Sequence, residues 1–473
     1  MVDGRELAAQ FEGAADFETR KILCGGQLLT VYFLDGLTSG GDIAEQVVRP
    51  LAQMTDEARE EILFTRAMQG GVWCASVKEA QSTQQAAQLL VNGFCVILFP
   101  QSGKALGCEV KTGEKRSPSP PETENTVKGA KDAFTETLRT NTSLVRRHLR
   151  TPGLRLSETV AGRRTLTKIT VCWIDGLTDP ELPRRMQERL GSIDIDGALS
   201  PAAIEEYVTG SRRTAFPLLE YTERTDHFCQ GLLDGQVGLL VDGLPLGYLA
   251  PVGLGRLMRS PEDRATDFLS ASMLRLLRYA ALGVSLLLPG LYAAMAMFHQ
   301  QMLPTKLLLS IIESKQNVPF STLLEVLGLL CAFELLQQAG LHLPQAVGTA
   351  VSIIGGLVVG TAAVDAKLVS PAALIVTASS GICGFTLPNR ELSDAVRLWR
   401  FVLTVLAGLW GLFGVTVGLL LLLTELAGLS SLGRSYLSPF GEAEVKGALV
   451  RPRLVRQKWR DGALKPMDEK NQR

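Results

Sequence analysis

The C-terminal half of the chain carries uncharged apolar segments long enough to cross a lipid bilayer. The segment 279–298 has 20 residues and no charged side chain. A helix of this length covers about 30 Å, the thickness of the hydrocarbon core. Four further apolar segments follow it, at 318–340, 346–364, 368–387 and 401–424. Because a soluble core needs no such succession of apolar runs, we expect an all-α polytopic membrane bundle over residues 271–428.

The residues before this bundle predict an α/β soluble region of two related units. LTVYFLDGLT at 29–38 and ITVCWIDGLT at 169–178 share the pattern of a buried strand, an Asp-Gly turn and a following helix. Later in each half, Gly93 and Gly235 stand between a helical pattern and a strand pattern, a place that favours a glycine C-cap. We therefore expect a first α/β unit at 1–110 and a second at 133–270.

Two polar segments complete the predicted organisation. Residues 111–132 are charged and Pro-rich, without apolar periodicity, which indicates an exposed linker. Residues 429–473 form a basic C-terminal tail. A helical pattern after the linker carries four arginines, for which we expect a solvated face, with contact to phosphates or lipid headgroups as the alternative. They are Arg139, Arg146, Arg147 and Arg150.

The balance of charge excludes one broad class of function. The 48 basic residues equal the 48 acidic residues, whereas a general nucleic-acid binder needs a basic surface for phosphates. The N-terminal residues 1–13 are polar and include acids, unlike a secretory signal peptide. We therefore expect the first unit on the cytoplasmic side of the membrane.

The positive-inside bias gives the same orientation but conflicts with the tail. Five arginines precede the first apolar segment, at Arg256, Arg259, Arg264, Arg275 and Arg278. Three more are expected in an inside loop before the last segment, at Arg390, Arg397 and Arg400. Five full crossings would place the basic tail outside, against its charge. Either one segment is re-entrant or interfacial, 318–340 being the first candidate, or 303–312 supplies an extra membrane element.

Glu325 and Glu334 are the sharpest candidates for a functional role within the apolar segments. A carboxylate in hydrocarbon is costly, so each should face protein, water or a cation. Nine helical residues turn through about 900°, which points the two side chains to opposite sides of one helix. One of them is then a candidate pore residue while the other contacts a neighbour. The alternative is an interfacial helix with both acids in water.

A stripe of small residues recurs every four positions in the third apolar segment: Gly348, Ser352, Gly356 and Gly360. Small side chains let helix backbones approach closely, and packing then drives helix association. The stripe is a candidate for packing within the chain, for a contact between subunits or for a narrow pore wall. A similar stripe in the last segment consists of Gly411, Gly414 and Gly418.

Signals for an enzyme, a cofactor or a metal are weak. The sequence has no GxSxG, P-loop or HExxH motif, and its eight cysteines form no CxxC pair. Asp35 and Asp175 follow predicted strands, where the alternatives are turn formation and ligand binding at a strand end. We predict no enzyme, no cofactor and no metal site.

The second unit and the bundle resemble the A subunit of GerA-type spore germinant receptors over roughly residues 134–440. Segments that carry the resemblance include LRTNTSLVRRHLR from Leu138, FPLLEYTERTDHFCQGLLDGQVGLLVDG from Phe216, PTKLLLSIIESKQNVPFSTLLEVL from Pro304 and GTAVSIIGGLVVGTAAVDAKLVSPA from Gly348. The first unit matches more loosely. The chain departs from the family at Thr225, where TERTD replaces the common TERPD.

The resemblance implies a subunit of the spore inner membrane with its N-terminal region on the spore-core side. It also implies a transporter-like B subunit and a lipoprotein C subunit as partners. The A subunit would self-associate into a ligand-gated channel for monovalent cations that acts early in germination. The alternatives are a secondary transporter, which usually shows membrane repeats that this chain lacks, and a non-conducting scaffold of a spore ion-release complex.

Overall fold

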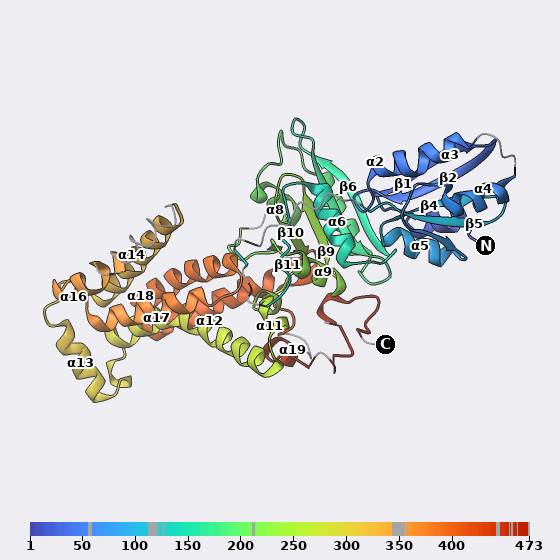
Figure 1. The fold of residues 1–473 in the computed structure, drawn as a ribbon. Coiled ribbons are helices and arrows are strands. Elements are labelled where there is room, and N and C mark those ends of the chain that lie inside the picture. The colour runs from blue at the N-terminus through green and yellow to red at the C-terminus, as the bar shows by residue number, and fades with distance from the viewer. Residues whose placement is uncertain are drawn as a thin grey trace.

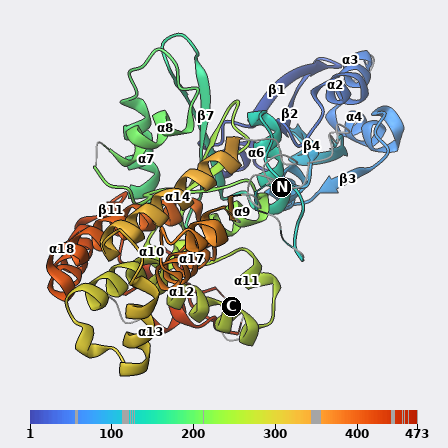
Figure 2. The same cartoon turned by 90° about the vertical axis from the view of Figure 1, so that its left-hand side faces the viewer.

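The computed structural model describes the chain apart from residues 55–58, 112–120, 122, 125, 127, 211–212, 343–354, 357, 441–444, 454, 456, 461 and 472–473. Its elements form two α/β units and a helical bundle that extends from the second unit (Figure 1). A view turned by 90° shows the first unit beside the second rather than on the bundle (Figure 2).

The first unit is built on a five-stranded sheet in the spatial order β1-β2-β4-β5-β3. Its strands are β1 (Phe17–Cys24), β2 (Gln27–Leu34), β3 (Val77–Ala80), β4 (Phe94–Phe99) and β5 (Lys104–Glu109). Its helices are α1 (Gly4–Gln10), α2 (Gly40–Asp42), η1 (Ile43–Val48), α3 (Arg49–Gln53), α4 (Glu60–Arg66), η2 (Ala67–Gly71) and α5 (Thr83–Val91).

The second unit repeats this topology, with strand order β6-β7-β9-β10-β8. Its strands are β6 (Leu154–Ala161), β7 (Thr167–Ile174), β8 (Glu220–Thr222), β9 (Val237–Val241) and β10 (Gly247–Ala250). Its helices are α6 (Leu138–His148), α7 (Glu181–Gly191), α8 (Pro201–Thr209) and α9 (Thr225–Leu233). The identical order of five strands confirms two related α/β units.

Helices cover both faces of each sheet, because successive strand residues point to opposite sides. In the first unit, Val31 packs with η1, α3 and α4, whereas the next residue, Tyr32, packs with α1 and α5. In the second unit, Val171 packs with α7 and α8, and Cys172 packs with α6 and α9. Each unit is therefore a three-layer arrangement with its sheet in the middle.

The repeated sequence segments occupy equivalent turns. Gly36 after β2 and Gly176 after β7 have φ of +90° and +74°. Gly93 after α5 and Gly235 after α9 have φ of +81° and +99°, the left-handed backbone of a glycine C-cap. The predicted C-caps are confirmed, and they explain why glycine stands at these positions in both halves.

Asp35 and Asp175 lie in the turns and form ion pairs with arginines. Arg139 Nε lies 3.1 Å from Asp35, and Arg155 Nη2 lies 2.9 Å from Asp175. All strand pairs in the two sheets, as far as the structure describes them, are antiparallel. The ligand sites found at the strand ends of parallel α/β sheets therefore give no guide to these two residues.

Helix α6 faces the first unit, which corrects the expected solvated arginine face. Arg146 is buried against Asp16, and Arg139 contacts Asp35, so both side chains belong to the contact between the units. Arg147 and Arg150 are exposed, as expected. The sequence pattern of this segment alone gives no sign that the first unit covers two of the four arginines.

The membrane bundle begins after two short helices, α10 (Leu254–Leu257) and α11 (Glu262–Ala265). Its elements are α12 (Phe268–Met297), η3 (Gln300–Met302), α13 (Thr305–Lys315), α14 (Thr322–His342), η4 (Val358–Ala362), α16 (Ala363–Asp365), α17 (Pro371–Phe385) and α18 (Arg390–Gly428). Among the described residues, α12, α14 and α18 are long and apolar enough to cross a membrane, and α17 is a shorter apolar helix. Most of the predicted segment 346–364 lies outside the described residues.

Helix α18 is a hairpin of two antiparallel arms rather than one span, which corrects the prediction for 401–424. Gly411 interrupts it with φ of +63° and ψ of −141°. An added Cβ on Gly418 would clash with the side chain of Leu403, and Leu392 shares a core cluster with Leu426. A straight helix would separate Leu392 from Leu426 by about 50 Å.

The hairpin returns the chain to the second unit, where the tail packs. After α18 come β11 (Ser430–Ser431), β12 (Arg434–Ser435), α19 (Val445–Leu449) and η6 (Gly462–Leu464). The Arg451 guanidinium donates to the carbonyl of Thr266, just before α12, and the backbone of Met467 donates to the carbonyl of Leu177. The tail therefore lies on the same side of the bundle as the α/β units, in agreement with its positive charge.

Candidate functional site

Glu325 is buried at the end of the bundle far from the α/β units. Its side chain accepts a 2.8 Å hydrogen bond from the backbone N–H of Ser370, the N-cap residue of α17. Lys315 at the end of α13 places its Nζ 3.4 Å from the carboxylate. The positive end of a helix and a lysine thus compensate the charge, and Glu325 connects α13, α14 and α17.

Glu334 lies nearer the α/β units and contacts α18. Arg397 Nη1 and Arg400 Nη2 each lie 3.0 Å from one of its two carboxylate oxygens. Arg397 also pairs with Asp394 on its own helix. The cluster therefore holds two arginines and two carboxylates within the bundle, which is how charged side chains are accommodated at membrane depth.

The cluster extends to the other two helices through Arg400. Its Nη1 donates to the Ser380 hydroxyl on α17 at 3.2 Å, and that hydroxyl donates to the backbone carbonyl of Ser285 on α12 at 2.7 Å. One continuous set of polar contacts thus joins α14, α18, α17 and α12. Glu334 is therefore connected to all four helices through polar contacts.

The structure does not bring the two glutamates together. Glu325 contacts α13 and α17, whereas Glu334 contacts α18. Sequence reasoning placed Arg397 and Arg400 in a loop before the last segment, and this was wrong, because α18 begins at Arg390 and includes both. Their partner Glu334 lies some 60 residues earlier in the chain, a distance over which helical periodicity gives no information.

The glycine stripe of the third segment is described only in part. Gly348 and Ser352 lie outside the described residues. Gly356 is exposed and Gly360, in η4, is half-buried. A Cβ added at either glycine would meet no described atom outside its own helix turn within 4 Å. By contrast, a Cβ on Gly414 would clash with the backbone of Leu406 in the opposite arm of α18, so that stripe packs within the chain.

A second group of buried charges lies where the second unit meets the bundle. Glu220 on β8 accepts a 2.7 Å hydrogen bond from Arg256 Nε and lies 3.1 Å from His227. Burial alone would raise the pKa of Glu220, but Arg256 and His227 outweigh it and hold the pKa at about 2. Arg256 also donates to Asp234 at the end of α9, at 2.9 Å.

Asp263 continues these contacts into the first membrane helix. Its carboxylate lies 3.1 Å from Arg275 and 2.8 Å from Arg278, both on α12. Arg275 and Arg278 are therefore held by a buried carboxylate rather than by solvent. Together with Arg256 they connect the second α/β unit to the start of α12 through ion pairs.

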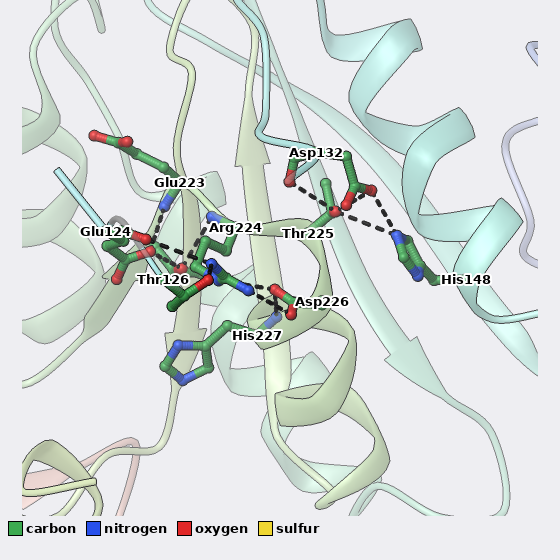
Figure 3. A network of polar contacts seen from close by, with 10 residues as sticks. Glu124, Thr126, Asp132, His148, Glu223, Arg224, Thr225, Asp226 and His227 are labelled. Atoms are coloured by element: carbon green, nitrogen blue, oxygen red, sulfur yellow. Dashed lines mark hydrogen bonds and ion pairs between the residues drawn. The ribbon is translucent and has the colours of Figure 1, made fainter. Parts of the chain in front are cut away.

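Figure 3 shows a third polar network, which holds part of the linker against the second unit. The guanidinium of Arg224 is almost fully buried and binds both carboxylate oxygens of Asp226, at 3.0 and 2.7 Å. It also donates to the Thr126 hydroxyl at 2.6 Å. Glu124 accepts from the Thr222 hydroxyl, and burial raises the pKa of Glu124. These residues of the expected exposed linker therefore pack on β8 and the start of α9.

The same figure shows Asp132 between His148 and Thr225 (Figure 3). His148 Nε2 lies 2.6 Å from Asp132, and the Thr225 hydroxyl donates to the same carboxylate at 2.5 Å. The hydrogen bond to His148 is the main reason why the pKa of Asp132 falls to about 2, and the same bond raises the pKa of His148. Thr225, where the chain departs from TERPD, thus forms a hydrogen bond through a hydroxyl group that proline does not have.

The comparison with known families decides the identity. The family model described as Bacillus/Clostridium GerA spore germination protein matches residues 5–466. The chain belongs to the GerA family. The resemblance predicted over 134–440 is confirmed, and the match extends it to the first α/β unit.

Individual relatives agree with this family. The chain is similar to the uncharacterized membrane protein YfkQ of Bacillus subtilis (strain 168), with 35% identity over 445 residues, 93% of this chain and 86% of that protein. It is similar to spore germination protein KA of the same organism, with 34% identity over 456 residues, 94% of this chain and 83% of that protein. GerA-family membership and the apolar helices make it a membrane protein of spore germination.

One solved structure is also similar to part of the chain. It is the crystal structure of the N-terminal domain of the A subunit of the Bacillus megaterium spore germinant receptor GerK3. The similarity has 23% sequence identity and a TM-score of 0.40, and it covers 52% of this chain and 92% of that chain.

Proposed function

We propose that this GerA-family chain is the A subunit of a nutrient germinant receptor and that several copies form a ligand-gated channel for monovalent cations. Its relatives include proteins named as spore germination proteins, and one similar structure belongs to the A subunit of a germinant receptor. The B and C subunits of such a receptor would be its partners. The chain would lie in the spore inner membrane.

The observation that carries the proposal is an incompletely covered part of the bundle. Of the most apolar 18-residue stretch in each helix, 22% is buried in α14, compared with 44% in α12 and 39% in α18. Within the described part of the chain, no atom outside their own helix turn lies within 4 Å of a Cβ added at Gly356 or Gly360. Small-residue helices gain from close packing in a membrane, so a neighbouring copy is the natural partner of this surface.

The charged cluster at Glu334 supports a conduction path along the poorly covered surface of α14. Glu334 lies on α14, and its side chain is partly exposed although its partner Arg400 is almost fully buried. Ionisable residues at membrane depth commonly mark ion pathways. Glu325 is fully buried in contacts within the chain, so we propose Glu334, rather than Glu325, for contact with the passing ion.

The proposed orientation of the chain in the membrane rests on the arginine side chains at one end of the bundle. Arg256, Arg264 and Arg278 precede the uncharged part of α12, and Arg451 of the tail packs beside them. Because positive residues favour the cytoplasmic side, we propose that both α/β units and the tail face the spore core.

The test of the channel proposal is nutrient-triggered potassium release from spores that carry Gly356→Leu. Gly283→Leu on α12 is the control, because that glycine is also helical with open space beside it. With both proteins at the wild-type level, we expect slowed or constitutive release with Gly356→Leu and normal release with Gly283→Leu. Normal release with both would contradict a subunit contact at Gly356 and favour a non-conducting scaffold.

A further inference from the structure

A cavity of about 570 Å³ lies between the second α/β unit, the start of α12 and the C-terminal tail. Six arginines line it: Arg256, Arg259, Arg264, Arg275, Arg451 and Arg460. Three carboxylates line it as well: Glu220, Asp226 and Asp263. Asp234 and Asp468 also pair with three of these arginines from outside the lining, so six positive and five negative side chains leave an excess of one positive charge. Such an excess in a partly open cavity attracts an anion.

The arginines differ in how their charge is compensated. Arg256 and Arg264 bind Asp234, and Arg275 binds Asp263. Arg451 is nearly buried, and among the described residues its guanidinium binds only the neutral backbone carbonyls of Thr266 and Arg264. A buried guanidinium without a carboxylate is costly, and an anion within the cavity would remove that cost.

Burial and the neighbouring arginines act together at Arg264. Burial lowers its pKa first, and the positive charges of Arg256 and Arg259 lower it further against the opposing effect of Asp234. At Arg256, by contrast, Glu220 and Asp234 outweigh burial and raise the pKa, so carboxylates compensate that side of the cavity but make no contact with the guanidinium of Arg451 among the described residues. The side chain of Arg264 is 43% exposed, so it is free to move toward a ligand while it stays near Asp234.

The cavity lies at the depth of lipid headgroups. The uncharged residues 279–298 span about 30 Å and fill the hydrocarbon core, so the first turns of α12 lie in the interface. These turns present strongly exposed apolar side chains, with Leu269 at 67% and Met273 at 69%. Pro452 and Trp459 add apolar surface to the cavity wall itself.

We propose that this cavity binds the phosphate headgroup of an anionic phospholipid. Arg451 and Arg264 would bind the phosphate oxygens, since guanidinium groups match their geometry with paired N–H donors. The acyl chains would lie along Leu269 and Met273 at the start of α12. The lipid would thereby join the tail, the second α/β unit and the first membrane helix, independently of whether the chain conducts ions.

The test is lipid binding to the purified full-length chain in detergent, measured by native mass spectrometry. The chain is titrated with phosphatidylglycerol and, separately, with phosphatidylcholine. Arg451→Gln and Arg264→Gln remove a cavity charge, and Arg147→Gln removes one from an exposed site on α6. We expect wild type and Arg147→Gln to retain phosphatidylglycerol in preference to phosphatidylcholine. Each cavity variant should bind it about fivefold more weakly, the effect of one basic residue near an anionic surface.

Further variants and a phosphate competition separate lipid binding from misfolding and from binding of a soluble anion. Arg451→Lys keeps the charge and should retain most of the binding, and a thermal midpoint for every variant shows whether it is folded. If Arg451→Gln does not fold, the more exposed Arg264→Gln decides. The proposal fails if both lipids bind equally, or if the cavity variants bind like Arg147→Gln. Displacement of the lipid by millimolar inorganic phosphate would assign the site to a soluble anion and overturn the lipid proposal.

Discussion

Arg146 on α6 and Asp16 ahead of β1 form a bidentate ion pair between the two α/β units, with both N–O distances at 2.7 Å. The two side chains are 1% and 2% exposed. The pair is supported by a backbone hydrogen bond of 2.8 Å from Ala15 to the carbonyl of Leu156. The units are therefore held together by a desolvated charge pair, whose loss on one side would leave a buried charge.

Asp16→Asn should destabilise the full-length chain by about 3–5 kcal/mol, because Arg146 would remain buried without a carboxylate. Asp35→Asn breaks the neighbouring ion pair between Asp35, 44% exposed, and Arg139, 39% exposed. It should lower the free energy of unfolding by about 1 kcal/mol or less. Chemical unfolding followed by fluorescence measures both variants. Equal effects would show that Arg146–Asp16 is no stronger than a surface pair.

Glu220→Gln should destabilise the chain at neutral pH but not at strongly acidic pH. The pKa of Glu220 is about 2 in the folded chain, below its ordinary value of 4.5, so its contribution is present above pH 4.5 and is lost as the pH falls toward 2. A thermal midpoint difference from wild type at pH 7 should therefore shrink between pH 4.5 and 2. Glu181→Gln, at an exposed pair with Arg185, is the control and should show little difference throughout.

His148→Gln should matter more at pH 6 than at pH 9. Asp132 raises the pKa of His148 above 6.5, so protonated His148 contributes stability below that value, and the contribution is lost as the pH rises through the raised pKa. Asp132, with a pKa of about 2, stays charged over this range. Thermal midpoints of wild type and variant should converge as the pH rises. A difference that is constant from pH 6 to pH 9 would show that the charge of His148 plays no part.

Gly411→Ala should disrupt the hairpin of α18. A Cβ there would lie 2.8 Å from the His299 ring, and the backbone has a conformation that is nearly restricted to glycine, at a cost of about 1–3 kcal/mol. Gly428→Ala, at the open end of the same helix, is the matched control. Thermal midpoints of the two variants in detergent compare them. If Gly411→Ala is as stable as Gly428→Ala, α18 does not turn at Gly411.

The hairpin also shows what the sequence reveals and where it stops. The positive charge of the tail conflicted with five full crossings, and the suspected segments were 318–340 and 303–312. The structure instead shows a reversal within 401–424, at Gly411. Hydropathy could not locate the reversal, because both arms of α18 are apolar and a single glycine turns the chain. The sequence contains the signal, Gly411 within a stripe of glycines, but helix packing gives the same pattern.

The soluble region was easier to predict than its contacts. The repeated Asp-Gly-Leu-Thr turns and the two glycine C-caps identified two related units, because local backbone geometry fixes those residues. The partners of Arg146, Arg256 and Arg400 lie between 22 and 130 residues away in the chain. Such pairs depend on tertiary packing, so single-sequence patterns described these arginines only as loop or surface charges.

The most direct test of the channel is potassium release from spores that carry Glu334→Gln, compared with Glu334→Gln combined with Arg397→Gln. The single change leaves an excess positive charge beside the proposed path and should slow nutrient-triggered release about tenfold or more. The double change restores the charge balance and should recover much of the rate. Normal release in the single variant, or equal loss in both at matched protein levels, would contradict an electrostatic role for Glu334 in conduction.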